Sequence, residues 1–78
     1  MELNERERQV QADYEWVLHD ATIQREQAGK VVAVHRHRIV AVGKDHREAI
    51  EKALRRPDCP PREEIAVVFV EGRTVVAG

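Results

Sequence analysis

The stretch KVVAVHRHRIVAVGKDHREAIEKALRR, residues 30–56, decides the fold of this chain. Two runs rich in valine and isoleucine flank a short His-Arg-His-Arg segment, a pattern that predicts a β-hairpin over residues 30–43. Asp45 follows, and Glu48 stands three residues later, as in a capping box, where side chains bond the free backbone N–H groups at a helix start. The stretch therefore predicts a hairpin that leads into a helix over residues 45–56.

Both faces of the predicted hairpin are apolar. In the expected pairing, one face carries two cross-strand pairs, Val34 with Ile39 and Val32 with Ala41. The other face carries Val31, Ala33, Val40 and Val42. An antiparallel pair with one wet face would alternate apolar with polar residues. We therefore expect the hairpin to be covered on both sides, by two helices or by a partner.

The N-terminal part predicts one long helix over residues 5–27, which Asn4 caps and Gly29 ends. Steps of 100° per residue give this helix two apolar faces. One face contains Leu3, Val10, Tyr14, Val17 and Ala21, with Leu18 at its edge. The opposite face contains Ala12, Trp16 and Ile23. A single sheet covers one face only, so we expect the second face to be an interface with another copy or another protein. The alternative is a helix that bends or ends near Thr22.

The C-terminal part, residues 65–77, predicts the remaining strands. Ile65–Val70 is apolar on both faces, and Glu71-Gly72-Arg73 is a turn signal. Thr74–Ala77 is a candidate fourth strand at the sheet edge. We therefore expect one small α+β domain over residues 1–78, in the order α-β-β-α-β(-β), with two helices and a three- or four-stranded, mostly antiparallel sheet.

The composition limits what the chain can be. Its 78 residues are 42% hydrophobic and 35% charged, and a chain this short buries only about 60% of its unfolded surface. The net charge of −1 is uneven, because residues 1–27 carry −4, residues 28–62 carry +5 and residues 63–78 carry −2. Cys59 is the only cysteine, the N-terminus is charged, and no apolar run approaches the ~18 residues of a membrane helix. We expect a cytoplasmic protein without a membrane segment.

Patterns for catalysis and for metal binding are weak. His35 and His37 have the i, i+2 spacing that could share a metal within one strand, but they straddle a predicted turn. Cys59 has no neighbouring base, and the chain has no serine for a Ser-His-Asp triad. It also has no glycine-rich phosphate loop. We therefore expect a non-enzymatic protein with no catalytic, cofactor-binding or metal site.

The positive middle of the chain could bind an anion or a nucleic acid. The candidate patch consists of Arg36, Arg38, Lys44 and Arg47. Such a patch would contact phosphates, although Phe69 is the only aromatic residue in the predicted strands that could stack on a base. The alternative is a solvated surface whose charges pair within the domain.

Several short motifs follow one another in a fixed order: Trp16, Gly29-Lys30-Val31-Val32-Ala33-Val34, Ile39-Val40-Ala41-Val42-Gly43, Asp45, Glu48-Ala49 and the Val-rich third strand. In this order the chain resembles a family of short, uncharacterised prokaryotic α/β proteins of the domain-of-unknown-function kind. That family usually has an aromatic residue at the position of Val31 and a glycine in the hairpin turn, where this chain has Arg36-His37. The resemblance implies a fold and no activity. A weaker likeness is to HicB-type antitoxins, whose hairpin also leads into a helix that begins with an acid and a Glu-Ala pair.

Two functions follow as expectations. The first is a protein–protein interaction or assembly module that associates with itself or docks on a partner through the first helix and a sheet edge. The second is an antitoxin-like or regulatory protein that binds a toxin or nucleic acid through its basic middle.

Overall fold

The computed structural model describes residues 4–72. In chain order its elements are α1 (Glu5–His19), α2 (Ala21–Glu26), β1 (Val31–Val34), β2 (Ile39–Gly43), α3 (His46–Leu54), the 3₁₀ turn η1 (Arg62–Glu64) and β3 (Ala66–Phe69). The strands lie in the order β2-β1-β3, and β1 is antiparallel to both neighbours. The predicted α+β fold is confirmed. The fourth strand predicted at Thr74–Ala77 lies outside the described residues.

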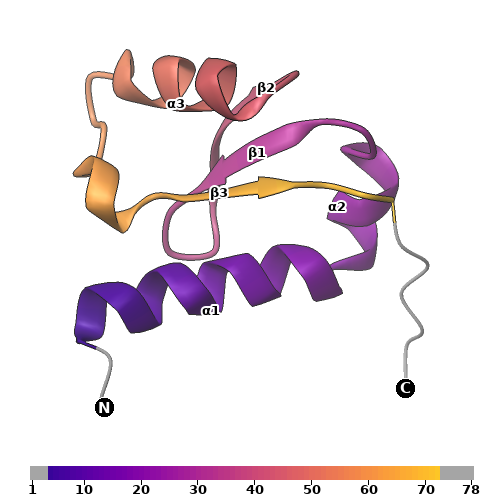
Figure 1. Ribbon diagram of the computed structural model, residues 1–78, viewed down its shortest axis with the longest axis horizontal. Coiled ribbons are helices and arrows are strands. Elements are labelled where there is room, and N and C mark those ends of the chain that lie inside the picture. Colours follow the sequence, from indigo (N-terminus) through magenta and orange to yellow (C-terminus); the bar gives the residue numbers. More distant parts are fainter. Residues whose placement is uncertain (1–3, 73–78) are drawn as a thin grey trace.

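Helices cover both faces of the sheet, with α1 and α2 on one side and α3 on the other (Figure 1). The core on the α1 side contains Val17, Ile23, Val32, Val34, Ala66, Val68 and Val70. The core on the α3 side contains Val31, Ala33, Ala49, Ala53 and Ile65. Every residue of β1 is buried, because this central strand has a helical layer above and below it. The prediction that the hairpin is covered on both sides is confirmed.

The register of the hairpin differs from the expected one at a single point. Val32 pairs with Val42 rather than with Ala41, because the pairing shifts by one residue and leaves Val40 without a paired residue on β1. Such a β-bulge turns the strand locally. As a result Ile39 and Val42 pack on the α1 side, whereas Val40 and Ala41 pack on the α3 side.

The single helix predicted over residues 5–27 is wrong, because the helix is interrupted at Asp20. Asp20 adopts an extended conformation (φ −89°, ψ 111°), and its carboxylate accepts a hydrogen bond of 2.9 Å from the backbone N–H of Ile23. Asp20 therefore ends α1 and caps α2. The interruption turns Ile23 into the core, where it is only 6% exposed. The alternative, a bend near Thr22, is close to what the structure contains.

The start of α3 packs tightly against the end of β2. Asp45 accepts a hydrogen bond from the N–H of Glu48, as the predicted capping box requires, whereas Glu48 accepts one from the N–H of Lys44 instead of that of Asp45. A Cβ placed on Gly43 would lie 2.5 Å from the backbone nitrogen of Ala49. Glycine at this position therefore lets the strand and the helix approach each other.

Within residues 4–72 no helix has both the length and the apolar character that crossing a lipid bilayer requires.

Candidate functional site

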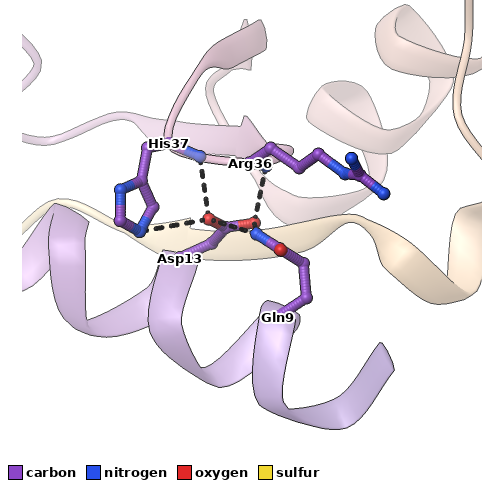
Figure 2. Close-up of polar contacts among 4 residues, drawn as sticks. All are labelled: Gln9, Asp13, Arg36 and His37. Atoms are coloured by element: carbon purple, nitrogen blue, oxygen red, sulfur yellow. Dashed lines mark hydrogen bonds and ion pairs between the residues drawn. The ribbon is translucent and has the colours of Figure 1, made fainter. Parts of the chain in front are cut away.

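A buried carboxylate holds the turn between β1 and β2. Asp13 of α1 is fully buried, and its two oxygens accept hydrogen bonds of 2.8 Å each from the backbone N–H groups of Arg36 and His37 (Figure 2). The side-chain amide of Gln9 donates to the same carboxylate at 3.1 and 3.2 Å. These donors replace water around the charge, which would otherwise be costly to bury. Asp13 thus links the first helix to the hairpin.

The turn itself has an unusual backbone. Arg36 and His37 have φ angles of 51° and 58°, and the turn is closed by a 2.9 Å hydrogen bond from His35 N–H to the Arg38 carbonyl. Two successive positive φ angles define the tight turn that usually contains Asn-Gly. For residues with a side chain, each such angle costs about 1–2 kcal/mol. The two hydrogen bonds to Asp13 offset this cost, which explains how the chain tolerates Arg36 and His37 in a turn that usually contains Asn-Gly.

The predicted interface residues do not form one exposed face. Trp16 is half-buried, and its indole stacks on the His37 imidazole with ring centroids 5.3 Å apart and planes inclined by 9°. The His37 Nε2 atom is 3.6 Å from an oxygen of Asp13. Ile23 is in the core, and only Ala12 is exposed. The expectation of a surplus apolar face on the first helix is therefore wrong, because the break at Asp20 buries one of its three members and the turn covers another.

The predicted basic patch is also divided. Arg36 and Arg38 precede β2, whereas Lys44 and Arg47 follow it, and five residues of strand separate the pairs by roughly 16 Å. Arg47 forms an ion pair of 3.1 Å with Glu51 on α3. The four residues therefore do not make one continuous surface, and binding of a nucleic acid or a toxin through them stays a prediction.

A different cluster of positive charge forms at the turn. Arg36 lies with Arg6 and Arg8 of α1 along an open groove of about 830 Å³, which we call the arginine groove. Gln9 and Ala12 line its floor on the helix side. Sequence reasoning missed this cluster, because about thirty positions separate its two parts and only the contact between Asp13 and the turn brings them together.

The two edges of the sheet differ. At the β2 edge, the bulge at Val40 interrupts the strand, and Arg56 donates a 3.1 Å hydrogen bond to the Val40 carbonyl. Bulges and charged side chains are common means of blocking an edge strand. At the other edge, the backbone N–H of Val70 donates to the Lys30 carbonyl and thus points toward β1. Because successive residues of a strand direct their backbone groups to opposite sides, those of Val67 and Phe69 point away from β1, toward the outer edge. Within the described residues this outer edge of β3 has neither a bulge nor a covering side chain.

Two pockets lie near the start of β3, and Glu63 of η1, which precedes this strand, lines both of them. On the α1 side, Val10 and Tyr14 line a groove of about 610 Å³ together with Glu63. On the α3 side, Ile65 and Val67 line a pocket of about 180 Å³ that also reaches Glu63. Two large apolar side chains are exposed in this region: Tyr14, which lines the larger groove, is 46% exposed, and Phe69 at the end of β3, which lines neither pocket, is 47% exposed. We call the β3 edge and these two pockets the β3 groove.

The remaining candidate residues do not form a reactive site. Among residues 4–72 no group of three or more His, Cys, Asp or Glu side chains is placed to hold a metal ion. Cys59 is half-buried, and its thiol donates to the Pro60 carbonyl at 3.1 Å.

A hydrogen bond from Arg56 holds the pKa of Asp58 below its ordinary value. This ion pair is exposed and structural.

Comparison of the chain with protein-family models, with curated proteins and with solved structures finds no match. The two family resemblances therefore stay predictions, and the function has to be argued from the residues themselves.

Proposed function

We propose that this protein is a non-enzymatic interaction module that binds an extended segment of a partner protein as an added strand at β3. The observation that supports the proposal is the outer edge of β3, which nothing covers among residues 4–72, together with the two pockets that meet at Glu63. In strand addition, main-chain hydrogen bonds supply affinity, and pockets for alternate side chains supply specificity. The β3 groove provides both features within the same few residues.

The mechanism follows from the alternation of a strand. The backbone groups of Val67 and Phe69 would each exchange hydrogen bonds with the added segment. Successive side chains of that segment point to opposite faces. One side chain would lie against Val10 and Tyr14 in the larger groove, and the next would lie against Val67 in the smaller pocket. Burial of the exposed Phe69 ring would add apolar contact to the main-chain bonds.

An extended segment suits this edge better than a second copy of the domain. Helix α1 contacts β3 and η1 on one side of the sheet. Pairing β3 with its copy would set the two strands about 4.8 Å apart. The α1 helix of one copy would then overlap the α1 helix of the other, because packed helices need about 8–10 Å between their axes. A single extended segment has no helical layer and avoids this collision.

The first helix keeps a role in this proposal, but on another face. The predicted contact through Trp16 is replaced by one through Val10 and Tyr14, which flank the open strand. The proposal thus retains the expected combination of the first helix with a sheet edge.

The experiment is a paired pull-down from native lysate treated with nuclease. The test variant is Phe69→Arg, and the matched control is Leu54→Arg, because Leu54 is 48% exposed and lines neither pocket of the β3 groove. We expect wild type and Leu54→Arg to retain a stoichiometric protein that Phe69→Arg loses. Hydrogen exchange of the complex should slow at the amides of Val67 and Phe69.

The proposal is wrong if both variants retain the partner equally or if exchange at the two amides is unchanged. Light scattering of the purified chain completes the test. A dimer that Phe69→Arg abolishes would show that the edge receives a second copy instead of a foreign segment.

A further inference from the structure

The arginine groove brings together side chains that are distant in the sequence. Arg6 and Arg8 belong to the first two turns of α1, and Arg36 belongs to the β1–β2 turn. Figure 2 shows the Arg36 side chain extended away from His37, toward the part of α1 that Gln9 marks. The backbone of Arg36 is fixed, because its N–H is bound to buried Asp13. One wall of the groove is therefore rigid.

The three guanidinium groups have no ion-pair partner within the part of the chain that the structure describes. None of them has a carboxylate oxygen within 4.0 Å among residues 4–72, whereas Arg47, Lys52 and Arg56 each have one. Glu5 and Glu64 also line the groove, so its local charge is +1. The chain accepts a strained backbone to place an arginine at this point of the turn, where asparagine or glycine would cost less. Such strain is common where a side chain has a function.

We propose that the arginine groove binds a phosphate-type oxyanion. Guanidinium groups match phosphate oxygens in pairs of parallel hydrogen bonds and remain charged at all physiological pH values. The positive end of the α1 dipole lies at the same end of the groove and favours an anion there. Three guanidinium groups that line one groove offer more hydrogen-bond donors than a single phosphate needs, so a diphosphate is the ligand to test. No residue of β3 lines this site, and its test does not require the proposed partner.

The experiment is a titration of the full chain with pyrophosphate at constant ionic strength, followed by ¹⁵N NMR. We expect saturable shifts at the amides of Glu5 to Arg8 and of Arg36. Arg8→Gln and Arg36→Gln should each weaken binding by about tenfold or more, since each removes a charge-assisted hydrogen bond. Glu64→Gln should tighten binding, because it removes a negative charge from the groove.

Arg25→Gln is the matched control, since Arg25 is an exposed arginine of α2 without an ion pair among residues 4–72 and away from the groove. We expect this control to bind like the wild type. The ring-current shifts of Trp16 and His37 report whether each variant keeps its turn. Shifts that grow linearly without saturation, or a loss of affinity that is equal in Arg25→Gln and Arg8→Gln, would overturn the proposal, because they indicate non-specific attraction to positive charge.

Discussion

Replacement of Asp13 by asparagine tests whether the hairpin turn depends on a group that only accepts hydrogen bonds. The substitution keeps the shape of the side chain. However, an amide has one oxygen and one NH₂ group, so it cannot accept from the N–H groups of Arg36 and His37 with separate atoms, as the carboxylate does. At least one backbone donor then faces another donor. The Gln9 amide must also find a new partner.

The magnitude follows from these contacts. A hydrogen bond to a charged group contributes about 1.5–3 kcal/mol, and each positive φ angle costs about 1–2 kcal/mol that Asp13 no longer offsets. We expect Asp13→Asn to lower the free energy of unfolding by about 3 kcal/mol. A domain of 78 residues has roughly 4–12 kcal/mol in total. The loss should therefore lower Tm by about 12–24 °C.

The assay is urea unfolding followed by circular dichroism. Asp58→Asn is the matched control, since Asp58 is an exposed aspartate and its replacement should change the free energy of unfolding by less than about 0.5 kcal/mol. The reasoning fails if Asp13→Asn stays within about 0.5 kcal/mol of the wild type. In that case the turn would hold its conformation without the buried carboxylate.

Three further predictions concern local geometry. Gly43→Ala should destabilise the protein by about 1–3 kcal/mol in the same urea assay, because the new methyl group collides with the nitrogen of Ala49, and an unchanged midpoint would contradict the close packing. Arg36→Asn should stabilise it by about 0.5 kcal/mol, since asparagine adopts a positive φ more readily, while a loss of stability would show that the arginine side chain supports the fold. Arg56→Gln should raise the pKa of Asp58, measured by NMR, because the guanidinium holds it low. Since that pKa is depressed in the folded state, the pair stabilises the protein above the unfolded pKa near 3.9 and the contribution disappears as the pH falls through the folded value.

The sequence predicted the parts of the fold that depend on local patterns. Three such features depend on residues that are close together in the sequence, and the structure contains all three. They are the strands of β-branched residues, the helix cap at Asp45 and the two apolar faces of the hairpin. A break was predicted only as an alternative, near Thr22, and its position at Asp20 was missed, because an aspartate within a run without glycine or proline is compatible with an exposed helical position. Its role as a cap depends on Ile23 entering the core.

The role of Asp13 was not predicted either, although a signal was present. Asp13 stands between Val10 and Val17 at spacings of three and four residues, on the stripe that the helix buries. An acid on a buried stripe needs donors from elsewhere in the fold. The donors are the N–H groups of a turn more than twenty residues later in the chain. Only the tertiary structure shows this pairing. The bulge at Val40 could not be predicted for the same reason. A shift of register by one residue does not change the pattern of a run in which every residue is apolar.

The two proposed sites share two residues, Asn4 and the charged Arg6. Arg6 lines both the arginine groove and the larger pocket of the β3 groove. When the Arg6 side chain binds a phosphate in the arginine groove, it is no longer available in the larger pocket of the β3 groove. The phosphate and the partner segment should therefore change each other's affinity by the same factor. Arg8 lines the arginine groove and is absent from the other pocket. We therefore expect Arg6→Gln to alter partner retention in the pull-down and to abolish its dependence on pyrophosphate, whereas Arg8→Gln alters pyrophosphate binding alone. Equal effects of the two variants on both ligands would contradict a shared side chain and indicate long-range charge.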